Sequence, residues 1–239
     1  MLPESFTDIL NAPCFLLNLD RCIDRWPTMK QRIEAAGFKP QRISAIDGIS
    51  GKCRSLCDQL MEGRPYEYAF EFDGKAGCTL SHVLLWEAII QNNIPYASIF
   101  EDDVLFHKDW NKLAPIYYQN TNKQTDIIYY GSQDVGSPTD SMITQNPVFT
   151  THAYLITLQG AKILLQKFKE SSKLWVIDCF IIGFMKSRFC PFHWQCWNGK
   201  IYPDPARHTG NKEIDPRNDG LVYQDASYES NVHCQASST

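Results

Sequence analysis

The stretch from Tyr96 to Phe106 constrains the fold most, because it places three consecutive acids inside an apolar run. It reads Tyr-Ala-Ser-Ile-Phe-Glu-Asp-Asp-Val-Leu-Phe. The residues before the acids are apolar and β-prone, and apolar character resumes after them. This pattern predicts a buried strand that presents carboxylates at its carboxyl end.

The three acids, Glu101, Asp102 and Asp103, need a neutralising partner if they end a buried strand. Neighbouring strand residues are about 3.3 Å apart, and like charges at that spacing repel each other strongly. A hard divalent cation such as Mg²⁺ or Mn²⁺, which also holds substrate phosphates, suits oxygen ligands. Taken alone, the run is equally consistent with a solvated acidic turn after a strand.

Size and composition favour one globular domain over residues 1–239, with an irregular segment at 198–239. The chain has 239 residues, of which 44% are hydrophobic and 13% aromatic, enough for a well-packed core. A net charge of −4 gives no basis for a nucleic-acid-binding surface.

Cysteine usage and the N-terminal sequence predict a cytoplasmic location. The nine cysteines are odd in number and scattered, unlike those of a small disulfide scaffold, so we expect a reducing compartment. The N-terminus lacks a basic and then apolar signal pattern, and no run reaches the ~18 apolar residues of a transmembrane helix.

The N-terminal part of the chain predicts a strand followed by a helix. Residues 13–19 form an apolar run, and apolar residues then recur at helical spacing until Gly37. Ligands of open α/β sheets lie beyond the carboxyl ends of strands, which places Asn18, Arg21 and Arg25 on a binding rim. The alternative for the two arginines is ordinary surface charge.

A second helix is predicted to open at Gly77-Cys-Thr-Leu-Ser-His82 and to end near Pro95. Ser81 and His82 would then lie in its first turn, where unpaired backbone N–H groups favour an anionic ligand. A buried structural role is the more common one for a single histidine.

Later segments supply further candidates. Residues 131–147 form a long polar connection, which we interpret as a lid or acceptor loop. Asp178 is the only acid in the apolar run 174–182, so it suits a general base or a hydrogen-bond acceptor for substrate. It would also serve as the N-cap of a helix over 179–186, and the two roles are compatible.

Two further sets of possible metal ligands follow. Cys190, His193 and Cys196 have a spacing that zinc tolerates, but an aromatic-rich strand is the favoured interpretation because a second ligand pair is missing. His208 lies in a turn-rich segment that can fold back to the site, where it would be an additional metal ligand.

Four segments together resemble glycosyltransferase family 25, which includes lipooligosaccharide galactosyltransferases and collagen hydroxylysine galactosyltransferases. They occur in the expected order and cover about residues 13–182. After Asn198 only Gln224 and Ser230 look like parts of a family motif. The segments are Phe15-Leu-Leu-Asn-Leu-Asp-Arg21 with Asp24-Arg25, Gly77-Cys-Thr-Leu-Ser-His82 with Trp86, Phe100-Glu-Asp-Asp-Val-Leu, and His152-Ala-Tyr-Leu-Ile-Thr with Gly160-Ala161.

The resemblance implies an α/β GT-A-type fold, with a mostly parallel sheet flanked by helices, and a UDP-hexose donor with Mn²⁺ or Mg²⁺. In place of the family's Asp-x-Asp element stands Glu101-Asp102-Asp103, with Asp103 the main metal ligand. Glu101 would bind the metal or orient water, and Asp102 would hold the donor ribose. The remaining donor contacts would come from Asn18, Arg21, Arg25, Ser81 and His82.

The implied reaction is transfer of galactose or glucose, with inversion, to a saccharide or hydroxylysine-type hydroxyl, as in lipopolysaccharide biosynthesis. Asp178 matches the family's second acidic position and would be the base. Two alternatives remain: a nucleotide-sugar-binding protein without turnover, and a metal-dependent phosphohydrolase or nucleotidyltransferase, which also needs clustered carboxylates. Neither the donor sugar nor the oligomeric state follows from the sequence.

Overall fold

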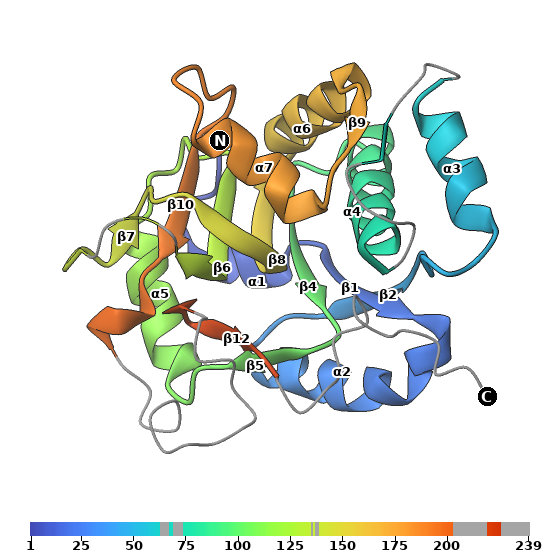
Figure 1. Ribbon diagram of the computed structural model, residues 1–239. Helices are drawn as coiled ribbons and strands as arrows, with labels where there is room; N and C mark the ends of the chain where they lie inside the picture. The colour runs from blue at the N-terminus through green and yellow to red at the C-terminus, as the bar shows by residue number, and fades with distance from the viewer. Residues whose placement is uncertain (63–66, 69–73, 135, 137–138, 203–218, 226–239) are drawn as a thin grey trace.

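The computed structural model describes residues 1–239 except 63–66, 69–73, 135, 137–138, 203–218 and 226–239. Within the described residues, an eight-stranded sheet forms the centre of the molecule (Figure 1). Its strand order is β2 (Pro40–Ala45), β1 (Cys14–Leu19), β4 (Tyr96–Glu101), β8 (Val148–Thr157), β6 (Ile127–Asp134), β10 (Trp194–Trp197) and β7 (Ile143–Thr144), with β11 (Asp219–Gly220) paired to β6.

The sheet is mixed but mostly parallel. β1 pairs in parallel with β2 and β4, and β10 pairs in parallel with β6. β8 runs antiparallel to both of its neighbours, β4 and β6, so those two strands point the same way. β2, β1, β4, β6 and β10 therefore run in one direction, which confirms the predicted α/β class.

Helices cover both faces of the sheet (Figure 1). One face is covered by α1 (Phe6–Asn11), α2 (Trp26–Ala35) and α5 (Trp110–Asn120). The other is covered by α3 (Lys52–Leu60), α4 (Gly74–Gln91), α6 (Leu158–Glu170) and α7 (Ile177–Met185). Two short 3₁₀ helices, η1 (Asp20–Arg25) and η2 (Gly199–Ile201), complete the described helical elements.

Burial on both faces explains the continuous apolar runs of the central strands. In β4, Ile99 packs with the core beneath α4, whereas the next residue, Phe100, packs with the core beneath α5. Leu17 and Leu16 of β1 divide between the two cores in the same way. Complete burial of such a side chain contributes roughly 1.5–3 kcal/mol, and successive buried positions of these strands contribute it to alternate faces.

Two small two-stranded sheets pair segments that are distant in the sequence. β5 (Val104–Phe106) pairs antiparallel with β12 (Val222–Gln224), and β3 (Glu67–Tyr68) pairs in parallel with β9 (Lys173–Leu174). We predicted an irregular segment after residue 198, but its described part contains η2, β11 and β12. β12 returns the chain to the end of β4.

The predicted loop at 131–147 is shorter than expected, because β6 continues through Asp134 and β7 follows at Ile143–Thr144. Gly131 permits β12 to lie against β6, since a Cβ on it would be 1.8 Å from the carbonyl oxygen of Val222. Gly131, at the start of the predicted loop, is thus a strand glycine required by close backbone approach.

Among the described residues, no helix is both long and apolar enough to cross a membrane. The eight cysteines in the described part of the chain are all free thiols.

Candidate functional site

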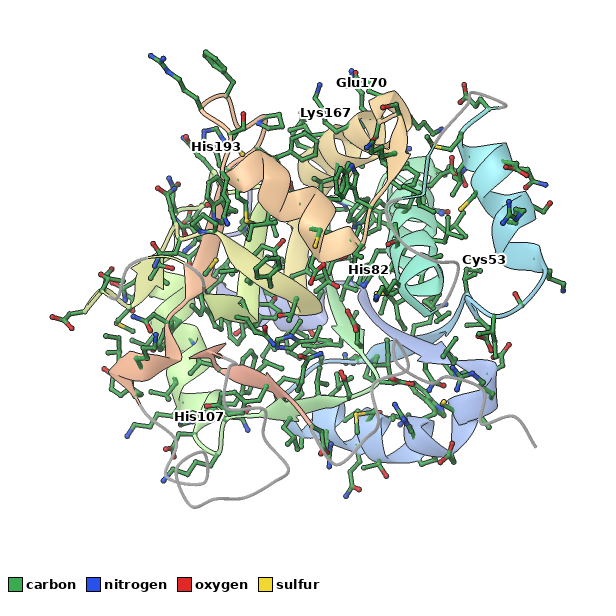
Figure 2. The ribbon with its side chains drawn as sticks, viewed as in Figure 1. Cys53, His82, His107, Lys167, Glu170 and His193 are labelled. Atoms are coloured by element: carbon green, nitrogen blue, oxygen red, sulfur yellow. The ribbon has the colours of Figure 1, made fainter. Side chains whose placement is uncertain are left out.

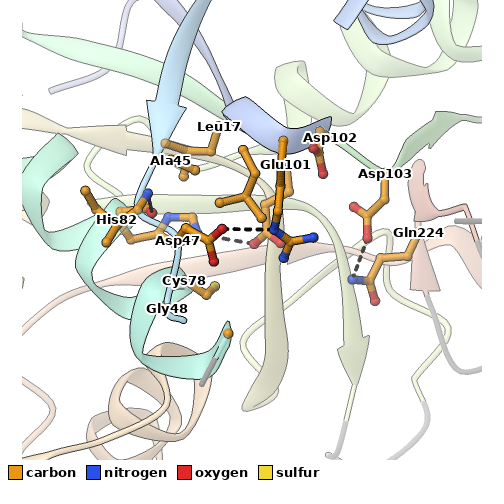
Figure 3. Close-up of a pocket in the computed structure, with 15 residues that line it drawn as sticks. Leu17, Ala45, Asp47, Gly48, Cys78, His82, Glu101, Asp102, Asp103 and Gln224 are labelled. Carbon is orange, nitrogen blue, oxygen red and sulfur yellow. Dashed lines mark hydrogen bonds and ion pairs between the residues drawn. The ribbon is translucent and has the colours of Figure 1, made fainter. Parts of the chain in front are cut away.

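A cavity lies at the edge of the sheet where the parallel strands β1, β2 and β4 end (Figure 3). This is the place where open α/β sheets bind ligands. Three carboxylates from the end of β4 lie on its wall. The cavity is lined by Leu17, Leu19, Arg21, Ala45, Ile46, Asp47, Gly48, Gly74, Cys78, Ser81, His82, Glu101, Asp102, Asp103 and Gln224.

The acidic run is divided between a strand end and a turn. Glu101 is the last residue of β4, and Asp102 and Asp103 form the turn that leads into β5. All three line the cavity, as predicted. Each carboxylate nevertheless has different surroundings.

Glu101 is held by donors from two other elements. His82 Nε2 lies 3.2 Å from its Oε1, and the Thr151 hydroxyl donates to the same oxygen at 2.8 Å. The Tyr154 hydroxyl lies 2.8 Å from His82 Nδ1 and accepts the indole N–H of Trp86 at 3.0 Å. Because Trp86 only donates, Tyr154 can give its own proton to Nδ1, so neutral His82 carries its proton on Nε2 and donates it to Glu101.

This network governs the protonation of Glu101. Burial would raise the pKa of this carboxyl, but the hydrogen bonds from His82 and Thr151 keep the pKa below its ordinary value. His82 thus has the buried structural partners expected of a core histidine while its ring also lines the cavity.

Asp102 is bound by Asn18 and Arg25 of the first βα unit, neither of which lines the cavity itself. The Asn18 amide donates to its Oδ2 at 2.6 Å, and an Arg25 guanidinium nitrogen lies 3.4 Å from Oδ1. Burial raises the pKa of Asp102, while Asn18 and Arg25 act in the opposite direction. Asn18 is fixed in turn, because its Oδ1 accepts from Arg42 Nε at 2.7 Å.

Asp103 differs from the other two acids in its hydrogen bonding. Its Oδ1 is buried without a hydrogen-bond partner, and its Oδ2 is 3.5 Å from the amide nitrogen of Gln224. Burial and the negative charges of Glu101 and Asp102 raise its pKa well above the ordinary value. An orphaned carboxylate oxygen among like charges fits a hard divalent cation, so the donor set is compatible with Mn²⁺ or Mg²⁺ at this position.

Arg21 also reaches the cavity, where its Nε donates to Asp47 Oδ2 at 3.0 Å. Asp47 was not among the predicted site residues. It follows the end of β2, so the same strand-end argument that selected Asn18 would have selected it. Cys78 was missed as well, although it is four residues before His82 on the same helix.

The prediction that Ser81 and His82 occupy the first turn of their helix is wrong. α4 begins at Gly74, so both residues lie well inside it. The Ser81 hydroxyl donates to Gly77 O at 2.7 Å and accepts the backbone N–H of Ile46 at 2.8 Å. Ser81 therefore joins α4 to the segment after β2, and the first-turn argument for an anion no longer applies to it.

Gly77 is a helix-interior residue rather than a helix start. A Cβ on it would be 2.4 Å from the carbonyl oxygen of Ile46 and 2.5 Å from the nitrogen of Gly48. Its lack of a side chain lets α4 approach the 46–48 segment closely enough to close one wall of the cavity.

Asp178 lies in the first turn of α7, near the cavity but not among its lining residues. Its negative charge raises the pKa of Cys78, which does line the cavity. The N-cap prediction is wrong: Val176 occupies that position, and Asp178 Oδ1 accepts the backbone N–H of Cys179 at 2.7 Å. Its role as a base stays a prediction.

The remaining metal candidates do not form a described site. His208 lies outside the described residues, as does Ser230. The Cys190 thiol donates to Phe192 O, and His193 is exposed and well separated from His82 (Figure 2). Residues 194–197 form β10, which agrees with the favoured interpretation of this segment as a strand.

A mostly parallel sheet with helices on both faces, and carboxylates at the end of a central strand in a cavity, defines an α/β protein of the GT-A type. The family model described as glycosyltransferase family 25 (LPS biosynthesis protein) matches residues 11–181. This match covers more than half of the chain, and the chain therefore belongs to glycosyltransferase family 25.

Curated relatives carry the same family name. A glycosyltransferase 25 family member of Drosophila melanogaster is 28% identical over 181 residues, covering 70% of this chain and 29% of that protein. The human protein named inactive glycosyltransferase 25 family member 3 is 26% identical over 166 residues, covering 63% of this chain and 28% of its own length. The chain thus spans under a third of the length of these relatives.

Among solved structures, a glycosyltransferase involved in the glycosylation of the major capsid of PBCV-1 superposes with a TM-score of 0.49 at 10% identity. The match covers 92% of this chain and 94% of that one.

Proposed function

We propose that the chain is a metal-dependent, inverting glycosyltransferase that moves a hexose, galactose or glucose, from a UDP-sugar to a saccharide or hydroxylysine-type hydroxyl. Membership of family 25 supports the transferase class. The observation that carries the proposal is Asp103, whose buried Oδ1 lacks a partner in the wall of a cavity at the end of a central strand.

Asp103 would hold the cation, with Glu101 and Gln224 beside it on the cavity wall. When bound, Mn²⁺ or Mg²⁺ supplies Lewis-acid stabilisation of the charge that develops on departing UDP. Glu101 accepts the hydrogen bonds of His82 and Thr151 at Oε1, so it would contribute Oε2 to the ion, whereas Asp103 Oδ1 is buried and has no partner. Asp103 is therefore the primary ligand of this proposal.

The first βα unit would bind the nucleotide. Asn18 and Arg25 fix the orientation of Asp102, whose carboxylate oxygens suit the two hydroxyls of a ribose. Arg21 lies at the cavity wall and provides positive charge for the phosphates. These residues would orient the donor so that its anomeric carbon faces the acceptor.

Inversion requires a carboxylate that takes the proton of the acceptor hydroxyl on the face opposite the leaving group. Asp178 is the candidate, because it is the acid in the first turn of α7, close enough to the cavity to act on Cys78 of its wall. Burial, Glu101 and then Asp178 all raise the pKa of the Cys78 thiol on that wall.

Two substitutions test these roles with different readouts. Asp103→Asn should lose the Mn²⁺-dependent part of UDP-hexose binding in titration calorimetry. Asp178→Asn should keep donor binding and lose acceptor-dependent UDP release, by about 10²–10⁴-fold for loss of a general base. Asp109→Asn, at a half-exposed position outside the cavity, is the control. Donor affinity that is equal with and without chelator would contradict the metal role.

A second candidate is a nucleotide-sugar-binding protein without turnover. The human and mouse relatives named inactive favour it. Donor binding in the presence of Mn²⁺, with no UDP release over a panel of saccharide and hydroxylysine acceptors, would support this candidate over the transferase.

A further inference from the structure

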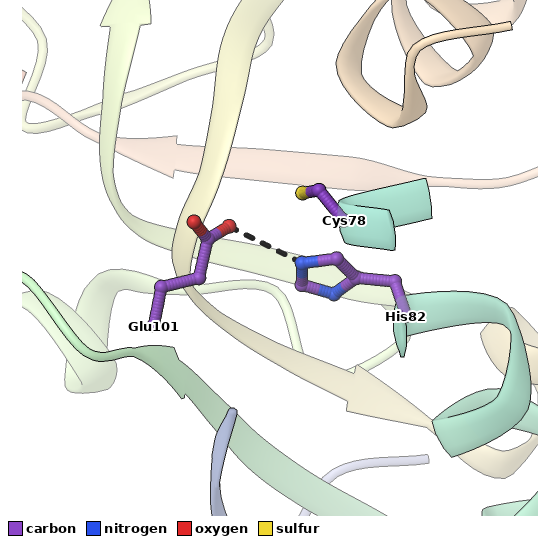
Figure 4. Close-up of side chains that lie close together, drawn as sticks. All are labelled: Cys78, His82 and Glu101. Atoms are coloured by element: carbon purple, nitrogen blue, oxygen red, sulfur yellow. Dashed lines mark hydrogen bonds and ion pairs between the residues drawn. The ribbon is translucent and has the colours of Figure 1, made fainter. Parts of the chain in front are cut away.

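Three side chains of different chemistry converge on the cavity wall beside the acidic turn. Cys78 and His82 are four residues apart on α4 and so share a helix face, and Glu101 reaches them from the end of β4 (Figure 4). One ligand atom from each, a thiol sulfur, an imidazole nitrogen and a carboxylate oxygen, lies within 4.8 Å of the other two.

A thiolate, an imidazole and a carboxylate are the ligands of zinc sites, whereas Mn²⁺ and Mg²⁺ favour oxygen. We propose that Cys78, His82 and Glu101 bind one thiophilic divalent cation, with Zn²⁺ the best match, in the wall of the cavity. The site differs from the one proposed at Asp103 in its ligands and in its preferred ion. The proposal does not depend on the transfer reaction.

The distances are close to those of a tetrahedral zinc site. With Zn–N near 2.0 Å and Zn–O near 2.1 Å, two tetrahedral ligands are about 3.4 Å apart. His82 Nε2 and Glu101 Oε1 are 3.2 Å apart. A sulfur and a nitrogen or oxygen ligand of tetrahedral zinc are about 3.5 Å apart, so the Cys78 sulfur must approach these two atoms by at most about 1.3 Å.

Outer-shell contacts already fix the orientation of two ligands. The Tyr154 hydroxyl holds His82 Nδ1 at 2.8 Å, which leaves Nε2 facing the site, and Thr151 holds Glu101. When Nε2 binds the ion, the imidazole proton would move to Nδ1 and Nδ1 would donate to the Tyr154 hydroxyl, which is the outer-shell bond that metal-binding histidines characteristically make. Since all three ligands line the cavity, the fourth coordination position opens into it.

The local charge favours a cation. The carboxylate of Glu101 is itself a ligand, and that of Asp103 lies on the same cavity wall. The carboxylates that disfavour a bare thiolate attract a divalent ion, and ion binding releases the thiol proton to solvent.

The test measures zinc binding to the full chain directly, without donor or acceptor. Competition with a chromophoric chelator gives stoichiometry and affinity, and replacement by Co²⁺ gives a thiolate-to-cobalt charge-transfer band if Cys78 is a ligand. Thermal unfolding of each variant establishes that it is folded. Cys190→Ser is the matched control, because it removes a half-buried thiol outside the site.

We expect one equivalent of zinc in the wild type and in Cys190→Ser. Cys78→Ser should lose the cobalt band and bind zinc at least about 100-fold more weakly, since loss of an outer-shell partner alone costs about 10–100-fold. Tyr154→Phe, which removes only such a partner, should weaken binding by about 10-fold.

Asp103→Asn separates the two metal sites, because it should leave the zinc equivalent in place while it removes Mn²⁺-dependent donor binding. Unchanged zinc affinity in Cys78→Ser, or loss of the cobalt band in Cys190→Ser, would overturn the assignment. Failure of the transferase assay would leave these binding measurements unaffected.

Discussion

Replacing Gly77 by alanine should destabilise the protein, although the substitution removes a glycine from a helix. In an unobstructed helix interior, Gly→Ala stabilises by about 1 kcal/mol. At Gly77 the added Cβ would be 2.4 Å from Ile46 O and 2.5 Å from Gly48 N, against 3.4 Å for an ordinary contact. Backbone must therefore move by about 1 Å, and overpacking of this kind costs typically 1–3 kcal/mol, occasionally more.

The structure places the cost at the upper end of that range. The obstructing atoms are backbone, which yields less readily than the end of a flexible side chain, and the movement also strains the hydrogen bond from Ile46 N to Ser81. The net expectation is a loss of about 1–2 kcal/mol, or a melting temperature lower by roughly 2–8 °C for a domain of this size. Displacement of Asp47 should weaken donor binding as well.

Gly183→Ala in α7 is the control, since nothing lies within 4 Å of a Cβ built there. It should stabilise the protein by up to about 1 kcal/mol through helix propensity alone. Denaturant unfolding of the two variants compares the same chemical change in two environments. If Gly77→Ala proved as stable as Gly183→Ala, the close approach of α4 to the 46–48 segment would be wrong.

In metal-free protein, Asp103→Asn should raise the free energy of unfolding at neutral pH. The folded state raises the pKa of Asp103, so the wild-type protein loses stability as pH rises above the unfolded pKa of about 3.9. The advantage of the variant should therefore shrink below that pH. Chemical unfolding at several pH values with chelator measures this, and an advantage that grows as pH falls would contradict it. Asn18→Ala should cost about 1–3 kcal/mol, because it removes the shortest hydrogen bond to buried Asp102. Asn92→Ala, in the exposed turn that follows α4, should stay within about 0.5 kcal/mol. Equal unfolding midpoints for the two alanine variants would refute that role of Asn18.

The sheet was predictable because its central strands are buried on both faces. In a chain of this size, continuous apolar runs such as 13–19 and 96–101 are typical of strands covered by helices on both sides, and their polar ends predicted the binding edge. The same argument selected Asn18 and Arg25, and in the structure both contact the carboxylate of Asp102.

Errors arose where a residue serves a tertiary contact that local rules do not describe. Gly77 was interpreted as a helix start, yet it is glycine because another backbone segment approaches it. Gly131 was interpreted as the start of a loop, yet it admits β12 alongside β6. The spacing of Cys78 and His82 indicates that they share a helix face, but their convergence with Glu101 depends on how α4 packs against the sheet.

The three acids of the run are stabilised by different partners, although their adjacency in the sequence suggests one shared cation. Glu101 and Asp102 are each neutralised or hydrogen-bonded by other side chains, and among the buried carboxylate oxygens of the three acids only Asp103 Oδ1 lacks a partner. If the chain itself satisfies two of the three acids, the fold does not require the ion, and a cation at Asp103 couples mainly to donor binding. In the Cys78→Ser variant, which lacks the proposed zinc site, chelator should therefore change the melting temperature little in the absence of UDP-sugar and lower it clearly in its presence, since a ligand stabilises only the state that binds it. A large chelator effect on the protein without donor would instead make the ion part of the fold.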